Sequence, residues 1–164
     1  NVVIEPNVVI HKGTIIKKGS RIRSSASVGS DGFGFERMGD NQTIRFAHLG
    51  RVILGENVEI GACTTVARGT LSDTVIGNNV KIDNLVHVAH NVRVGDGALI
   101  TACAEISGSV EVGENVWISP NVSIREKLKI GANVLIGIGA VVTKSILDDT
   151  VVAGNPARPI VKKD

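Results

Sequence analysis

The sequence predicts an all-β fold, a parallel β-helix in which each coil takes 18 residues. The first observation is an aliphatic residue at every sixth position, twelve times in succession from Ile76 to Val142. The second is a glycine at every eighteenth position, namely Gly77, Gly95, Gly113 and Gly131. The third is composition: 43% of the 164 residues are hydrophobic, yet the chain has only three Phe, one Trp and no Tyr. Because aromatic side chains usually fill irregular cores, their scarcity favours a narrow core of Val, Ile and Ala.

A strict six-residue period excludes an α-helix, whose 3.6-residue turn cannot keep such a pattern on one face. A period of this length, kept over a long chain, indicates a solenoid of stacked coils. Each coil then holds three short strands and three corners, and the corners require residues that tolerate a positive φ. The corner residues that follow the repeated glycines are Asn79, Gly97, Asn115 and Asn133. The strands of successive coils should stack roughly 4.8 Å apart.

The repeat extends toward the start of the chain with two interruptions. Hexads run from Ile4 to Val28 and resume at Leu54, so we expect residues 33–47 to form a projecting loop. Four extra residues in the next coil predict a smaller bulge near residues 69–73. Loops that leave a regular scaffold often carry function.

The domain organisation follows from this pattern. We expect a β-helix over residues 1–147, with loop insertions near 33–47 and 69–73, and a C-terminal tail over residues 148–164. The chain starts inside the repeat, so either an N-terminal piece is missing or the protein never had one. Flat walls and exposed solenoid ends favour association with other chains.

Composition and charge exclude several function classes. With 18 basic and 16 acidic residues the formal net charge is +2, so no broad positive field for nucleic acid is expected. The sequence has neither a membrane span nor a signal peptide, which predicts a cytoplasmic protein. Cys63 and Cys103 show no metal-ligand spacing, and we interpret them as free thiols. No metal requirement is expected.

Four segments of the chain are similar to one family. They are SVGSDGFGF at 27–35, GRVILGENVEIGACTTVARGTLSDTVIGN at 50–78, KIDN at 81–84 and VAHNVRVG at 88–95. They resemble the UDP-3-O-acylglucosamine N-acyltransferases of the hexapeptide-repeat acyltransferase superfamily, over roughly residues 27–113. The resemblance implies a left-handed β-helix, a homotrimer, a nucleotide-sugar substrate and a role in lipid A (lipopolysaccharide) biosynthesis.

The two ends of the chain depart from that family. The family's N-terminal uridine-binding domain is absent from this sequence, and a second family histidine is replaced near Lys127. The ending IGIGAVVTKSILDDTVVAGNPARPI instead resembles CoA-dependent acetyltransferases that act on nucleotide-linked amino sugars. The donor therefore stays open between acyl-CoA, with acetyl-CoA favoured, and a long acyl chain on acyl-carrier protein.

Two residues carry the expected chemistry. By the resemblance, His90 in VAHN corresponds to the catalytic base, and the pKa of a histidine suits removal of an ammonium proton. Gly108 follows His90 by 18 residues, so it should lie on the next coil at the same point. The resemblance assigns such a glycine amide to an oxyanion hole. The competing interpretation is a solvent-facing corner histidine and a glycine needed only for its φ.

Further candidates surround this pair. His87 and Glu105 should lie side by side on adjacent coils close to the base. Glu105 or Asp83 could orient a histidine, or could simply be solvated surface acids. Asn84 and Asn91 flank the site and are candidates for binding substrate hydroxyls.

Aromatic and C-terminal residues are the candidates for ligand contacts. Phe33 and Phe35 could stack on a nucleobase or sugar, or could pack on a neighbouring wall. By the resemblance of the C-terminal segment, the donor would contact Gly139, Ala140, Lys144, Gly154, Asn155, Pro156 and Arg158. Backbone amides suit a pantetheine arm, and Lys144 and Arg158 suit phosphate.

Three functions are weighed. The leading hypothesis is an acyltransferase that moves an acetyl or longer acyl group from a thioester donor to the amine of a nucleotide-linked amino sugar. The second is an O-acetyltransferase of a sugar hydroxyl or small alcohol. The third is a bare scaffold or a zinc hydratase, whose metal needs three histidines. Against zinc, only His87 and His90 are expected to cluster, with His11 and His48 on remote coils.

Overall fold

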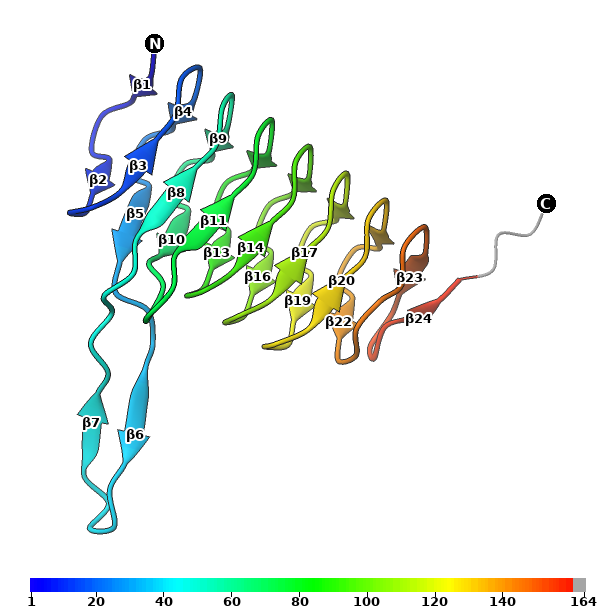
Figure 1. Cartoon of the computed structure of the whole chain (residues 1–164). Coiled ribbons are helices and arrows are strands. Elements are labelled where there is room, and N and C mark those ends of the chain that lie inside the picture. Colours follow the sequence, from blue (N-terminus) through cyan, green and yellow to red (C-terminus); the bar gives the residue numbers. More distant parts are fainter. Residues whose placement is uncertain (161–164) are drawn as a thin grey trace.

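The computed structural model describes residues 1–160 and, over that range, contains strands and turns but no helix. Strands of two to four residues stack into three parallel sheets, which form the walls of a prism (Figure 1). The fold is a left-handed parallel β-helix, so the predicted fold class is confirmed. None of the described residues forms a helix that could cross a membrane.

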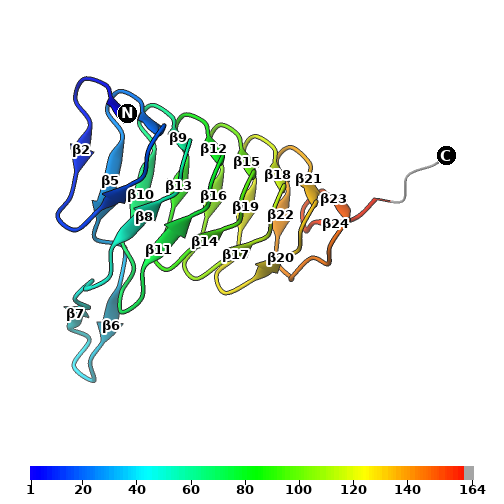
Figure 2. The ribbon, with the colours of Figure 1, turned by 45° about the horizontal axis from the view of Figure 1, so that its top comes forward.

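The three walls follow the chain in rotation, as the stacked strands of Figure 2 show. The first wall contains β1 (Val3–Ile4), β4 (Arg21–Ile22), β9 (Glu59–Ile60), β12 (Lys81–Ile82), β15 (Leu99–Ile100), β18 (Trp117–Ile118), β21 (Leu135–Ile136) and β23 (Val151–Ala153), with β24 (Arg158–Pro159) antiparallel at its end. The second wall contains β2 (Val9–Ile10), β5 (Ser27–Ser30), β10 (Thr65–Ala67), β13 (His87–Val88), β16 (Glu105–Ile106), β19 (Ser123–Ile124) and β22 (Val141–Val142). The third wall contains β3 (Ile15–Ile16), β8 (Val52–Leu54), β11 (Thr74–Ile76), β14 (Arg93–Val94), β17 (Glu111–Val112) and β20 (Lys129–Ile130).

The strand register confirms the 18-residue coil. Lys81 pairs with Leu99, and His87 pairs with Glu105. From Ile22 onward the hexad residues are buried, and Ile100 is only 1% exposed, whereas Ile4 and Ile10 in the first coil are 52% and 36% exposed. Burying an aliphatic side chain of this size stabilises the fold by roughly 1.5–3 kcal/mol, so the column of hexad residues is the core.

The corners have the backbone that the sequence pattern requires. Asn79, Gly97 and Asn115 have φ angles of 58°, 70° and 55°. Gly and Asn reach this left-handed region at low cost, which explains their recurrence there. Cys63 and Cys103 also occupy such corners and are exposed free thiols, as predicted.

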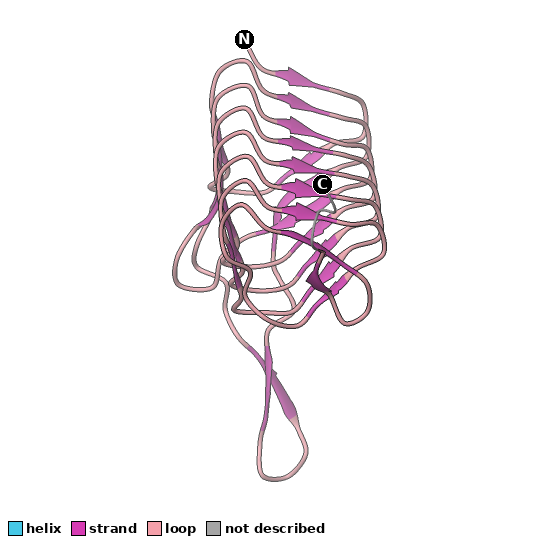
Figure 3. Cartoon of the chain, turned by 90° about the vertical axis from the view of Figure 1, so that its right-hand side faces the viewer, coloured by secondary structure: helices cyan, strands magenta, loops and turns pink. Residues whose placement is uncertain are grey.

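Both interruptions of the repeat fall on the same edge of the prism, between the second and third walls. We call this edge the His90 edge; it consists of residues 31–51, 68–73, 89–92, 107–110, 125–128 and 143–145, together with the first corner at residues 11–14. Its first segment contains the antiparallel hairpin of β6 (Phe35–Arg37) and β7 (Thr43–Arg45). The hairpin projects away from the walls, as Figure 3 shows along the prism.

The β-helix ends later than the expected boundary at residue 147. Ile146 bridges to Ile130, and β23 pairs in parallel with β21. β24 then folds back on β23. The separate tail expected over residues 148–164 is therefore corrected as far as residue 160, because its backbone continues the ladder. Residues 161–164 lie outside the described range.

Candidate active site

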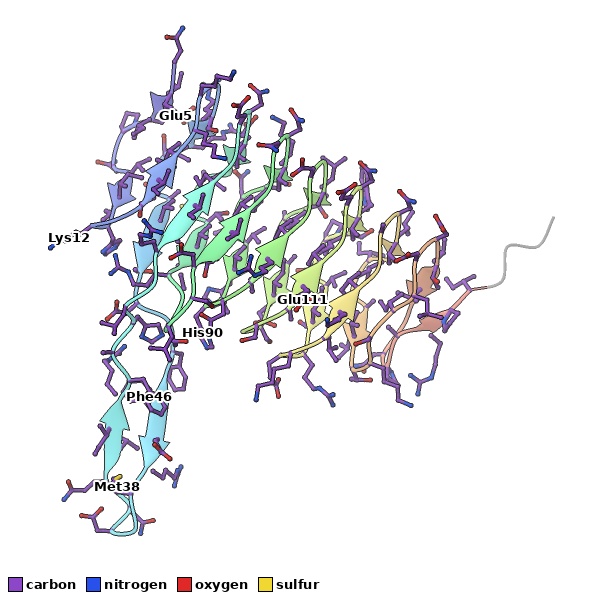
Figure 4. All side chains as sticks on the ribbon, in the orientation of Figure 1. Glu5, Lys12, Met38, Phe46, His90 and Glu111 are labelled. Carbon is purple, nitrogen blue, oxygen red and sulfur yellow. The ribbon has the colours of Figure 1, made fainter. Side chains whose placement is uncertain are left out.

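His90 lies at the base of the projecting hairpin. It follows β13 in the corner at residues 89–92, and Figure 4 shows it where the hairpin leaves the β-helix, with Phe46 farther along the hairpin. The ladder fixes the backbone on both sides of the corner, since the Ala89 N–H donates to the Ile106 carbonyl at 2.9 Å and the Arg93 N–H donates to the Val110 carbonyl at 3.0 Å. A regular repeat thus holds this histidine beside the largest irregular segment of the chain.

Two glycines enclose the His90 ring. A Cβ placed on Gly108 would lie 2.5 Å from Cε1 and 2.8 Å from Nε2 of His90. A Cβ placed on Gly32 would lie 3.0 Å from Cδ2 of the same ring. Any side chain at either position would occupy space that the imidazole already fills, because protein interiors leave few voids. Glycine at position 108 therefore has a specific steric reason, beyond corner geometry.

The backbone amide of Gly108 is available beside this ring. Among residues 1–160 its N–H has no hydrogen-bond acceptor, whereas its carbonyl accepts from the Lys127 N–H at 3.0 Å. The Ser109 N–H donates to the His90 carbonyl at 2.9 Å, which puts Gly108 on the next coil, as its spacing predicts. An imidazole and a free amide N–H on successive coils can serve as a base and an oxyanion donor.

A second histidine, His48, lies against His90. The two ring centroids are 5.8 Å apart and the rings meet at 67°. His48 is 6% exposed, and its Nδ1 lies 3.1 Å from the Phe46 carbonyl, to which it can only donate. Its Nε2 has no partner among the described residues. The expectation that His48 lies on a remote coil is wrong, because the hairpin returns to the edge from which it leaves.

The surroundings favour the neutral form of His90. Burial lowers the pKa of His90, and the positive charges that nearby His48 and His87 can carry lower it further. Both causes disfavour a second positive charge in the same confined space. A neutral imidazole can accept a proton, which the expected chemistry requires.

Asn91 is engaged within the chain. Its Oδ1 accepts a hydrogen bond from the Thr70 N–H at 2.8 Å, and its Nδ2 donates to Thr70 Oγ1 at 2.9 Å. The same Nδ2 lies 3.3 Å from Nδ1 of His90. These contacts leave the amide little capacity for the substrate hydroxyls that the sequence analysis suggested.

An apolar cleft of about 480 Å³ opens beside His90, between the hairpin and the bulge. Its lining consists of Phe33, Gly34, Phe35, Phe46, Ala47, Thr70, Leu71 and His90. The rings of Phe33 and Phe35 are 4.9 Å apart, and the Arg45 guanidinium lies 4.5 Å from the centre of the Phe35 ring. Phe33 is 86% exposed, so it does not pack on a wall of its own chain.

The other candidates near the base are only partly brought together. His87 is exposed on β13 beside Glu105, as expected, but the Glu105 carboxylate accepts from Ser107 Oγ at 3.0 and 3.1 Å. Asp83 and Asn84 lie on the edge between the first and second walls, away from the His90 edge. There, Asn84 Oδ1 accepts from the Ala62 N–H at 2.7 Å.

Of the candidates for donor binding, too, the structure brings only some together. Lys144 and Arg158 line one pocket of about 340 Å³. Lys144 also lies on the His90 edge, three coils beyond His90. The Ala140 side chain is buried, and its N–H and carbonyl bond to Gly137 and Ser123, so it offers nothing to a ligand.

The remaining donor candidates lie on the edge between the first and second walls and in the turn after β23. Gly139 is exposed on the edge between the first and second walls, with a φ of 65°. Gly154, Asn155 and Pro156 form the exposed turn between β23 and β24, and the Gly154 carbonyl accepts from the Val141 N–H at 3.0 Å. Among residues 1–160, no three His, Cys, Asp or Glu side chains gather as metal ligands.

Comparison with known proteins identifies the repeat. Residues 73–108 and 109–144 match the family described as bacterial transferase hexapeptide (six repeats). A UDP-3-O-acylglucosamine N-acyltransferase of Coxiella burnetii is 51% identical over 84 residues, which make up 51% of this chain and 25% of that protein. The enzyme of the same name from Pseudomonas paraeruginosa is 52% identical over 85 residues, 51% of this chain and 24% of that protein. The chain thus spans about a quarter of the length of these curated relatives.

Solved structures extend the similarity to the whole fold. The UDP-N-acetylglucosamine acyltransferase of Francisella novicida superposes with a TM-score of 0.84 at 26% identity, over 98% of this chain and 59% of that chain. The chain is therefore a left-handed β-helix in which residues 73–144 match the bacterial transferase hexapeptide family, and about half of its length is similar to the UDP-3-O-acylglucosamine N-acyltransferases.

Proposed function

We propose that this chain is an acyltransferase that moves an acyl group from a thioester donor to the amine of a nucleotide-linked amino sugar. The observation that carries the proposal is the contact of the His90 ring with Gly108, at the mouth of an apolar cleft; the Gly108 N–H has no acceptor among residues 1–160. The names of the relatives that share half of this chain support the same reaction.

In this reaction His90 removes a proton from the substrate ammonium group. The freed amine attacks the thioester carbonyl carbon, and the carbonyl oxygen gains negative charge beside the Gly108 N–H. The new C–N bond forms and the C–S bond breaks. Of the two protons that the nitrogen loses, His90 passes one to the leaving thiolate and the other goes to solvent. A positioned base contributes about 10²–10⁴ in rate, and one oxyanion donor about 10²–10³.

The donor pocket supports acyl-CoA. Lys144 and Arg158 provide two cations around one pocket, and such groups suit phosphate. Three coils separate Lys144 from His90, about 14 Å at the usual strand spacing. A pantetheine arm lying along the His90 edge would connect the two positions. Acetyl-CoA is the favoured donor, and acyl-carrier protein is the alternative.

The cleft beside His90 supports an acceptor or acyl chain with an apolar face. Phe33 and Leu71 are 86% and 84% exposed, although both are large and apolar. Exposed apolar side chains that line one concavity are typical of ligand-binding sites. A nucleobase, the face of a sugar ring or the acyl chain itself would cover them.

A homotrimer is part of the proposal. On the first wall, Leu99, Trp117 and Leu135 follow one another in register, and Trp117 and Leu135 are 45% and 42% exposed. An apolar row of this kind favours association with another chain. A cytoplasmic location also stays a prediction.

Transfer to a sugar hydroxyl is the second candidate. The Francisella novicida protein that shares the fold acts, by its name, on UDP-N-acetylglucosamine. The amine of that sugar is already acylated, so a hydroxyl would receive the new group. The same base and amide would serve a hydroxyl acceptor equally well.

The test uses the purified chain with a UDP-linked 3-O-acylglucosamine and its 2-hydroxy analogue, each with acetyl-CoA or a long-chain acyl-carrier protein. Mass spectrometry should find amide product, and His90→Ala should lose most turnover while staying folded. His11→Ala is the matched control, since His11 lies in the corner after β2 on the same edge, three coils before His90, and contacts Ser27 at 3.4 Å. Ester product alone, or wild-type turnover in His90→Ala, would overturn the proposal.

A further inference from the structure

The amide of Asn91 has a fixed orientation. A carboxamide oxygen only accepts hydrogen bonds, and a carboxamide nitrogen only donates them. The Thr70 backbone N–H must donate, so the Asn91 atom 2.8 Å away from it has to be the oxygen. Ser72 Oγ lies 3.4 Å from the same oxygen. The end of the amide that faces His90 is therefore the nitrogen.

This orientation has a consequence for the His90 ring. Asn91 Nδ2 lies 3.3 Å from His90 Nδ1 and can only donate to it. Nδ1 must then present its lone pair. A neutral imidazole that accepts at Nδ1 carries its proton at Nε2.

We propose that Asn91 is a positioning residue that holds His90 as the Nε2–H tautomer, and that the bulge at residues 69–73 sets this state by fixing the Asn91 amide. The inference deepens the proposed function and rests on it only for its catalytic meaning. Asn91 is the residue whose side chain hydrogen-bonds to the His90 ring within residues 1–160.

Proton uptake by His90 competes with this contact. A protonated imidazole has an N–H at both nitrogens, so Nδ1–H would face the N–H group of Asn91. Turning the amide over would restore a hydrogen bond to His90 but would leave the Thr70 N–H facing a donor. His90 therefore takes the ammonium proton only as Asn91 or the bulge moves.

The cleft connects this device to the substrate. Thr70 holds the Asn91 amide, and Thr70 and Leu71 also line the cleft. A molecule that fills the cleft touches the bulge and can release Asn91. His90 is thus held with its proton at Nε2 and its Nδ1 facing Asn91 until the cleft is occupied.

Other polar groups near His90 do not fix its tautomer. His48 Nδ1 donates to the Phe46 carbonyl, and His87 is exposed on β13. From the hairpin, Arg45 points to the Gly32 carbonyl at 3.3 Å. Within the described residues none of these groups hydrogen-bonds to the His90 ring, although His48 and His87 both lower the pKa of His90.

Asn121 provides a matched control. It occupies a left-handed corner with a φ of 58°, close to the 61° of Asn91. Within residues 1–160 its side chain makes no hydrogen bond, and its N–H donates to the Ala102 carbonyl at 3.1 Å. Glycine tolerates both corners, so Asn91→Gly and Asn121→Gly remove only a side chain.

The test is NMR of the free protein with ¹⁵N-labelled histidine, which distinguishes the protonated ring nitrogen from the other. We expect neutral His90 to carry its proton at Nε2 in the wild type and in Asn121→Gly. Asn91→Gly should give a mixture of tautomers. Asn91→Asp, whose carboxylate accepts from Nδ1–H, should move the proton to Nδ1 and raise the pH at which the ring titrates.

A wild-type ring protonated at Nδ1 would overturn the inference. So would an Nε2–H signature that persists in both Asn91 variants. Because no substrate is present, this outcome is independent of the acyl-transfer assay. If turnover fails while the tautomer responds as expected, the proposed function is at fault and the role of Asn91 stands.

Discussion

At the edge between the first and second walls, the central coils turn through short corners that repeat without insertion, and their polar side chains serve the backbone. Asn84 Oδ1, for example, accepts from the Ala62 N–H of the preceding coil. The His90 edge uses the same hexads but is interrupted twice, by the hairpin and by the bulge. There a polar ring, His48, is buried, and a cleft forms.

The difference between the two edges indicates that the regular coils provide stability and that the interrupted His90 edge provides the chemistry. The regular coils provide the stacked backbone ladders that hold the prism together. The inserted hairpin stands beside the bulge and creates the concavity, while the coils beneath it keep His90 and Gly108 in register. Changes in the coils should therefore affect folding, and changes on the His90 edge should affect turnover.

The largest expected effect is on stability, in the regular coils. Ile100→Ala removes a side chain that is 1% exposed and should cost about 2–5 kcal/mol of unfolding free energy, because the stacked core cannot close the cavity. Urea titration measures it. Ile10→Ala is the matched change in the first coil, where Ile10 is 36% exposed, and should cost less. Equal losses at the two positions would contradict a core confined to the inner coils.

The next largest effect is expected on turnover, where Gly108 contacts the His90 ring of the preceding coil. Gly108→Ala should reduce kcat/KM by about 10²–10³, because the new Cβ takes the place of the His90 ring and blocks the oxyanion position. The change should also cost about 1–3 kcal/mol of stability through overpacking.

A double variant provides the control for this steric explanation. All of the nearest atoms to the new Cβ belong to His90, so the stability cost of Gly108→Ala should vanish in a His90→Ala background. A cost that persists there would point to backbone strain instead.

The pH dependence should separate His90 from an ordinary surface histidine. The pKa of His90 is lowered, first by burial, so the ring stays neutral and able to accept a proton as the pH falls through the ordinary histidine value of about 6.5. The acid limb of kcat/KM should therefore lie below that value. His90 also contributes to the free energy of unfolding. This contribution is fully present above the pKa of His90 in the unfolded chain and is lost as the pH falls through its lower pKa in the folded protein. An acid limb above the ordinary value would refute this picture of the site.

The smallest effect should come from the bulge. Leu71 is 84% exposed, so Leu71→Ala should change stability by no more than about 0.5 kcal/mol. Its loss from the cleft should raise KM for the substrate several-fold. Ile138→Ala, at a residue 72% exposed on the edge between the first and second walls, should leave KM unchanged. Equal KM values for the two variants would show that the bulge does not contact the substrate.

Counting along the hexads could have located more of the site than it did. The steps from Val28 to Leu54, from Val66 to Ile76 and from Val88 to Val94 all pass from the second wall to the third. Both insertions therefore had to lie on the His90 edge, and the return of the first insertion had to place His48 on that edge, where the fold brings its ring within 5.8 Å of the His90 ring. That signal was in the spacing. The extension of the coil past residue 147 was not, because its strands leave the six-residue period.

The sequence by itself determined the strands, the corners, the 18-residue coil and the alignment of Gly108 with His90. Each of these depends on a period and on contacts between neighbouring coils, and a period can be counted. Tertiary structure alone decided which end of the Asn91 amide faces His90, and that the hairpin and the bulge enclose a cleft. It also decided that the N–H and the carbonyl of Ala140 are both hydrogen-bonded within the chain. These features depend on how irregular segments pack side chain against side chain, and such packing has no repeat from which it could be predicted.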